Sequence, residues 1–155
     1  MLEPLQIVQT EAQSAAVIRI TVPRAEIQRV MEPAIKELLD GLAARGVAPA
    51  GPLFTYHLKT DAQAFDFELG VPVNSPFSAS GRVKAGQLPA ARVARTVYGG
   101  PYEGLYDAWK AFGARIAAEG LTPTTGLWER YLSGPESSPD PANWRTELNQ
   151  PLAEG

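Results

Sequence analysis

The sequence contains no cysteine and a single histidine, His57, among its 155 residues. Without cysteine there can be no disulfide, no thiolate metal site and no cysteine nucleophile. A lone histidine also rules out a metal site built from several histidines and weakens any Ser-His-Asp arrangement. We therefore expect no metal. The lack of thiols fits a reducing compartment, so a cytoplasmic location is expected.

Positive charge is scarce too, with 14 Lys and Arg against 17 Asp and Glu and a net charge of −3. A surface that binds phosphates needs clustered Lys and Arg, so no direct contact with nucleic acid is expected. No apolar run approaches the roughly 20 residues of a membrane span, and the N-terminus lacks the pattern of a signal peptide. Without such a span, we expect no membrane partner. No Gly-x-Gly-x-x-Gly, P-loop or His-Glu-x-x-His motif occurs, so we also expect no cofactor.

The rest of the composition is that of one globular domain over residues 1–155. Hydrophobic residues make up 45% and charged residues 20% of the chain. A chain of this length can bury roughly two thirds of its extended surface around one core.

An internal repeat organises the chain. Residues 31–58 align with residues 105–132 at a constant offset, 120 − 46 = 74, so the two halves cover about 5–80 and 81–155. In each half an apolar stripe with helical spacing ends at a glycine, Gly46 or Gly120, and a proline follows three residues later. The paired stripe residues are Ala34, Ile35, Leu38, Leu42 and Ala43 in the first half and Ala108, Trp109, Phe112, Ile116 and Ala117 in the second.

Strand candidates flank each helix. A β-branched run precedes it, at 16–22 and 91–98, and two further strands follow it, the last at 66–73 and 145–152. Short runs at 5–10 and 81–88 add one strand at the front of each half. Pro33, inside the first helical pattern, predicts a kink or two shorter helices. The Pro- and Ser-rich stretch 133–143 is long enough to act as a mobile flap.

The predicted fold class is therefore α+β. Two tandem, pseudo-symmetric βαββ-type modules would form an antiparallel sheet with two main helices. A central cavity between the modules is where a small molecule would bind.

The strand at 127–132 carries a carboxylate where a buried strand normally has an apolar residue. Alternation puts Leu127, Glu129 and Tyr131 on one face, and Trp128, Arg130 and Leu132 on the other. The second set is apolar at both ends, so we expect it on the packed side and the first set in the cavity. In the repeat, Thr55 stands where the second half has Glu129. The alternative is that Glu129 forms an ion pair across the sheet with Arg92, Arg95 or Arg145.

Aromatic residues could wall the same cavity. Trp109 and Phe112 lie on the helix stripe and are expected in the core. Tyr98 and Tyr131 are better pocket candidates, because a buried phenol needs a hydrogen-bond partner. The full set of predicted ligand-binding residues is Glu129, Tyr131, Tyr98, Tyr102, Tyr106, Trp144, His57 and Thr55.

Three ordered motifs resemble one known family. They are "YGGPYEGLYDAW" at 98–109, "WERYLSGP" at 128–135 and "WRTELNQPL" at 144–152. They are similar to the Gly-Pro-Tyr helix entry, the Glu-x-Tyr strand and the closing Thr-Glu-x-x-x-Pro strand of the GyrI-like effector-binding domain, which occurs in multidrug-responsive transcription activators.

The resemblance implies a cavity for hydrophobic, often cationic, small molecules, with the acidic residue of the Glu-x-Tyr strand, here Glu129, facing the ligand. No DNA-reading segment precedes the matched region, so we expect a stand-alone member that senses or sequesters drugs. One alternative is a hydrolase of strained electrophilic compounds, with Glu129 as general base and Tyr98 and Tyr131 as hydrogen-bond donors. Another is an inhibitor that binds a protein partner such as gyrase.

Overall fold

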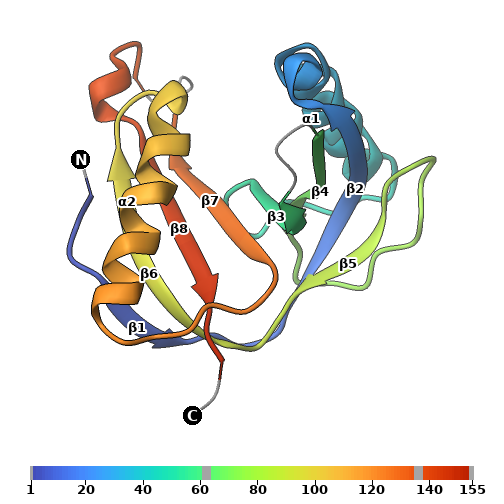
Figure 1. Cartoon of the computed structure of the whole chain (residues 1–155). Helices are drawn as coiled ribbons and strands as arrows, with labels where there is room; N and C mark the ends of the chain where they lie inside the picture. Colours follow the sequence, from blue (N-terminus) through green and yellow to red (C-terminus); the bar gives the residue numbers. More distant parts are fainter. Residues whose placement is uncertain (1, 61–63, 135–137, 154–155) are drawn as a thin grey trace. The chain divides into compact units, whose positions relative to one another are not determined.

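The computed structural model describes residues 2–60, 64–134 and 138–153. The chain divides into two compact units, which we call the first unit (residues 11–90) and the second unit (residues 1–10 and 91–155). In the described part of the chain, each unit has four β-strands and one α-helix (Figure 1). The predicted α+β class is confirmed, and the central cavity stays a prediction. No helix of the described residues is long and apolar enough to cross a membrane.

The first unit is an antiparallel sheet with helix α1 packed against it. Its strand order is β3-β4-β2-β5. Helix α1 (Ile27–Ala44) follows the short 3₁₀ helix η1 (Arg24–Glu26) and buries Ala34, Leu38 and Leu42 in the unit's core. The strands are β2 (Gln13–Pro23), β3 (Phe54–Thr60), β4 (Ala64–Pro72) and β5 (Lys84–Leu88).

The second unit repeats this plan with the strand order β1-β6-β8-β7, again antiparallel. Helix α2 (Leu105–Ala118) follows the 3₁₀ helix η2 (Tyr102–Gly104), lies against β6 (Figure 1) and buries Ala108, Phe112 and Ile116. The strands are β1 (Gln6–Gln9), β6 (Arg92–Gly99), β7 (Leu127–Ser133) and β8 (Arg145–Pro151), with the 3₁₀ helix η3 (Pro141–Asn143) before β8.

The two helices end in the same way, as the repeat predicts. Gly46 and Gly120 have φ values of 66° and 73°. Their N–H groups donate to the carbonyl three residues earlier, and the following N–H groups, of Val47 and Leu121, donate five residues back. This is a Schellman-type end, which favours glycine because only glycine adopts a positive φ without a steric cost.

Three details differ from the sequence prediction. The front strands are exchanged: β1 pairs with β6 and β5 pairs with β2, so the compact units do not coincide with the halves 5–80 and 81–155. Helix α1 continues through Pro33 instead of dividing there. Ala43 and Ala117, at the end of each apolar stripe, are exposed, because each lies about 100° around the helix from the buried residue before it, Leu42 or Ile116.

Part of the predicted flap, residues 135–137, lies outside the described residues. The remainder is held by hydrogen bonds. The Trp144 indole Nε1 donates to the Ser138 carbonyl at 2.9 Å, and the Asp140 carboxylate accepts from the Ala142 N–H at 3.0 Å at the start of η3. Mobility of this segment stays a prediction.

Candidate functional site

Glu129 lies in the middle of β7, on the sheet face that α2 covers. It pairs directly with Leu148 of β8, and Leu148 belongs to the apolar cluster of Phe112 and Ile116 from α2. Paired residues of neighbouring strands project from the same face, so the carboxylate points to the helix side. Its residue is 8% exposed, so the charge is turned away from bulk water.

Two neutral groups donate hydrogen bonds to this carboxylate. The Trp109 indole Nε1, on α2, donates to Oε2 at 2.6 Å, and the Tyr131 hydroxyl donates to Oε1 at 2.7 Å. Among the described residues, no ion pair involves Glu129. Neutral donors satisfy the oxygens but do not cancel the charge, so a net negative charge remains beneath the helix and can attract a cation.

An aromatic group adjoins the carboxylate. The Tyr102 ring lies edge-on to the Tyr131 ring, with 5.9 Å between the ring centroids. The centroids of the Tyr102 and Trp144 rings are 5.0 Å apart. Tyr102 is 38% exposed, whereas Tyr131 and Trp144 are half-buried. These three predicted residues come from η2, β7 and the position between η3 and β8. Aromatic faces near a carboxylate can contact both the apolar and the charged part of a lipophilic cation.

Tyr98 lies apart from this group, under the start of α2. Its hydroxyl donates to the Pro101 carbonyl at 2.8 Å, and the residue is 7% exposed. Burial raises the pKa of the Tyr98 phenol above its ordinary value, and the negative charges of Glu103 and Asp107 raise it further. Its proposed role in ligand binding or hydrolysis stays a prediction.

This environment predicts an alkaline destabilisation. Because the folded pKa of Tyr98 exceeds the unfolded value of about 10, its contribution to stability is complete below that pH and is lost as the pH rises toward the folded pKa. Tyr98→Phe should remove one late-ionising phenol, seen by ultraviolet absorbance, and flatten the decline in stability above about pH 10. Burial also raises the pKa of Tyr56, so one late step should persist. An unchanged titration in Tyr98→Phe, compared with the exposed-site control Tyr106→Phe, would contradict this assignment.

The other predicted residues occupy different surroundings. Tyr106 on α2 is 64% exposed, and the Lys110 ammonium lies 5.5 Å from its ring centroid. Thr55 and His57 belong to the first unit, where His57 Nε2 lies 3.1 Å from Thr55 Oγ1 and the His57 ring stacks on Phe67 at 5.1 Å. Within the second unit, the structure thus brings Glu129, Tyr131, Tyr102 and Trp144 together.

A family model for the GyrI-like small molecule binding domain matches residues 3–153. The chain belongs to the GyrI-like family. No curated protein matches its sequence.

Solved structures share the fold of this GyrI-like domain. EcmrR in its complex with DNA matches with a TM-score of 0.86 and 20% identity, over 98% of this chain and 58% of that chain. The EcmrR C-terminal domain matches with a TM-score of 0.82 and 19% identity, over 98% of each chain. SAV2435 bound to tetraphenylphosphonium matches with a TM-score of 0.65 and 10% identity, over 97% of this chain and 94% of that chain. The chain therefore spans somewhat more than half of EcmrR as it stands in the DNA complex.

The face assignment for β7 in the GyrI-like domain needs correction. Trp128 is buried as predicted, but α2 packs on the Glu129 face, and Leu132, which lies at a β-bulge between Tyr131 and Ser133, is 44% exposed. Each face of this strand carries a mixture of apolar and polar side chains, so the sequence pattern alone could not identify which face meets the helix. The ion-pair alternative also fails, because no ion pair among the described residues joins Glu129 to Arg92, Arg95 or Arg145. Arg95 contacts Asn149 and Glu147 instead.

Sequence reasoning missed the second role of Trp109. The residue packs against the apolar core as predicted, but its indole also supplies the shorter of the two hydrogen bonds to Glu129. Its place at the edge of the helical stripe is the signal, because an indole there can pack and still direct its N–H to a polar group on the sheet.

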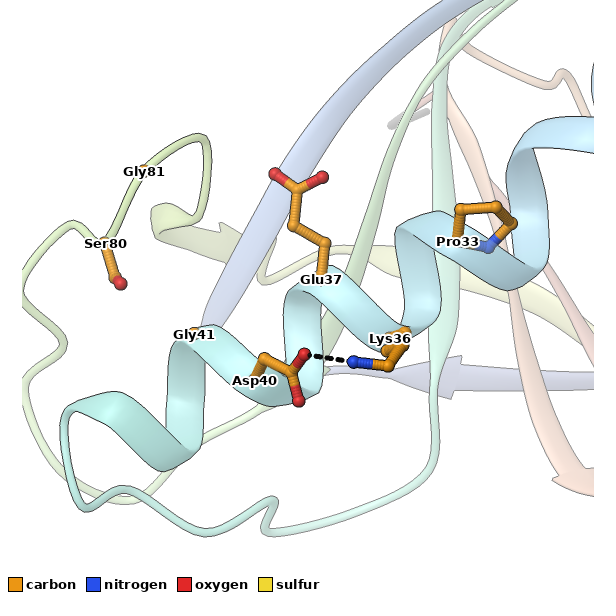
Figure 2. A pocket seen from close by; sticks show the side chains of 7 residues that line it. All are labelled: Pro33, Lys36, Glu37, Asp40, Gly41, Ser80 and Gly81. Carbon is orange, nitrogen blue, oxygen red and sulfur yellow. Dashed lines mark hydrogen bonds and ion pairs between the residues drawn. The ribbon is translucent and has the colours of Figure 1, made fainter.

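Two surface pockets lie elsewhere in the GyrI-like domain. One, of about 440 Å³, lies beside α1 in the first unit (Figure 2), where Lys36 pairs with Asp40 at 2.8 Å and Glu37 with Arg82 at 2.7 Å. The other, of about 480 Å³, lies in the second unit and is lined by Pro4, Leu5, Ile7, Arg115, Ala118 and Glu119. Glu129 lines neither. In the described part of the chain, no cluster of three or more His, Asp or Glu side chains could hold a metal ion.

Proposed function

We propose that this GyrI-like domain binds a hydrophobic cation in drug sensing or sequestration, with Glu129 as the electrostatic anchor. The observation that carries the proposal is a carboxylate only 8% exposed whose described partners are two neutral donors. The family is a small-molecule-binding one, and the similar SAV2435 was solved with tetraphenylphosphonium, a lipophilic cation. Tyr131, Tyr102 and Trp144 would form the aromatic wall, with Tyr98, Tyr106, His57 and Thr55 as further candidates.

The energetics favour a ligand that is both charged and apolar. A charge pair at about 4 Å, with an effective dielectric constant near 20, gives roughly 4 kcal/mol before desolvation, and an aromatic face adds about 2 kcal/mol. Micromolar binding needs about 8 kcal/mol net of ordering costs. Burial of apolar ligand surface must supply the rest, so a small hydrophilic cation should bind poorly.

Binding of tetraphenylphosphonium should reach the micromolar range. Triphenylphosphine oxide, which is neutral and similarly apolar, should bind at least tenfold more weakly, because it gains nothing from the Glu129 charge. Quenching of tryptophan fluorescence measures both, since all three tryptophans (Trp109, Trp128 and Trp144) lie in the second unit. Equal affinity for the two compounds would overturn the role of the carboxylate.

The same site separates the alternatives. Incubation with a strained electrophile should leave the compound unchanged if the protein sequesters ligands. Repeated turnover that Glu129→Gln abolishes would instead support a hydrolase with Glu129 as general base. A pulldown of gyrase that Glu129→Gln does not affect would favour a protein partner.

A further inference from the structure

The hydroxyl of Thr146 is buried and has no hydrogen-bond partner among the described residues. The residue is 0% exposed. Buried hydroxyls in folded proteins are nearly always hydrogen-bonded, because leaving one unpaired is unfavourable. An unpaired hydroxyl therefore needs an explanation other than the stability of the fold.

Thr146 lies in the row of residues next to the Glu129 carboxylate. It pairs with Tyr98 on one side and with Tyr131 on the other, and Tyr131 is two residues from Glu129 along β7. All four side chains therefore belong to one sheet face. A diagonal neighbour of this kind lies roughly 7–8 Å away, which is within the span of one small ligand.

The repeat shows that the scaffold does not need a hydroxyl here. In the first unit the equivalent position is Phe67, at the offset 146 − 67 = 79 that also relates Glu147 to Glu68. Phe67 pairs with Ile20 and His57, is 1% exposed and stacks on the His57 ring. One unit thus fills this position with an apolar ring, and the other places a smaller, unpaired polar group beside its buried carboxylate.

We infer that the Thr146 hydroxyl is a second polar contact of the binding site and hydrogen-bonds a hydroxyl or carbonyl group of the ligand whose cationic centre lies at Glu129. The ligand class is then an amphipathic cation whose one polar group lies roughly 7–8 Å from its charge, the separation of diagonal neighbours on a sheet. This inference rests on the proposed function and adds to it a specificity that charge and apolar contact cannot give.

The first arm of the test measures thermal stability. Thr146→Val removes an unpaired buried hydroxyl and should raise the melting temperature by about 2–4 °C. Thr96→Val is the matched control: Thr96 is 2% exposed in the neighbouring row of the same face, but its hydroxyl donates to the Glu3 carbonyl at 2.7 Å. That variant should lower the melting temperature. A similar fall in Thr146→Val would show a native partner and overturn the inference.

The second arm compares tetraphenylphosphonium with (4-hydroxyphenyl)triphenylphosphonium, which carries a hydroxyl one ring away from the phosphorus. The native protein should prefer the hydroxylated cation, Thr146→Val should reduce this preference about fivefold, and Thr146→Ser should retain it. If Thr146→Val binds both cations with the same ratio of affinities as the native protein, the contact between Thr146 and the ligand is overturned, while the proposed function stands. Failure of the native protein to bind either cation would overturn the proposed function and this contact with it.

Discussion

Glu129→Gln is expected to lower the affinity for tetraphenylphosphonium about a hundredfold, a loss of roughly 2.8 kcal/mol. The gross attraction of the charge pair is roughly 4 kcal/mol, and desolvation of the carboxylate on ligand entry offsets part of it. Loss of the charge should therefore outweigh the loss of any single aromatic contact. Calorimetric titration measures the effect directly.

The substitution should leave the fold intact because glutamine can keep both hydrogen bonds. Its amide oxygen can accept from the Trp109 indole, and its amide nitrogen can donate to the Tyr131 hydroxyl, which then acts as acceptor. The thermal melting temperature should change little. A loss of affinity in Glu129→Gln can then be attributed to the charge rather than to disordering of α2.

Asp107→Asn is the matched control for this charge removal. Asp107 is exposed on α2, in the same unit, so its effect on a bound cation is screened by water and salt. The affinity of the Asp107→Asn variant for tetraphenylphosphonium should stay within about twofold of the native value. Equal losses in the two variants would mean that only the overall field of the unit matters, and Glu129 would not be the anchor.

The elements of this fold could be predicted because their signals are local. The stripe residues Leu38 and Phe112 repeat at helical spacing, and Gly46 and Gly120 mark helix ends that need a positive φ. Strand pairing across the chain carries no such local signal. The runs at 5–10 and 81–88 read as strands, but nothing in them indicates that each pairs with a strand of the other repeat half.

The candidate site was predictable where the two halves of the repeat differ. Glu129 stands out because its counterpart is Thr55, and Tyr131 because a buried phenol needs a hydrogen-bond partner. The prediction of which face of the strand at 127–132 meets the helix was wrong, because both faces of this strand carry large apolar residues. Trp109 was missed because an indole that packs and an indole that donates to a carboxylate have the same helical position. An unpaired hydroxyl, such as that of Thr146, can be recognised only when all its neighbours are placed.

Gly104→Ala is expected to destabilise the second unit by about 2–3 kcal/mol. Gly104 lies in η2, directly before α2, and a Cβ at this position would overlap the Tyr98 hydroxyl and lie 3.0 Å from Tyr98 Cζ. Its backbone is in the right-handed helical region, so the loss would come from the overlap and not from backbone strain. Tyr98 is buried and cannot move away without losing its hydrogen bond to the Pro101 carbonyl.

Gly113→Ala is the control, because it makes the same substitution in the middle of α2 where a Cβ would meet nothing within 4 Å. That variant should gain up to about 1 kcal/mol from helix propensity. Tyr98→Phe in the Gly104→Ala background should recover part of the loss, because it removes the overlapping oxygen, although alone it costs about 1 kcal/mol. Urea unfolding followed by tryptophan fluorescence reports on the second unit. Strictly additive effects of the two substitutions would contradict the contact, because residues that touch should show a coupling energy.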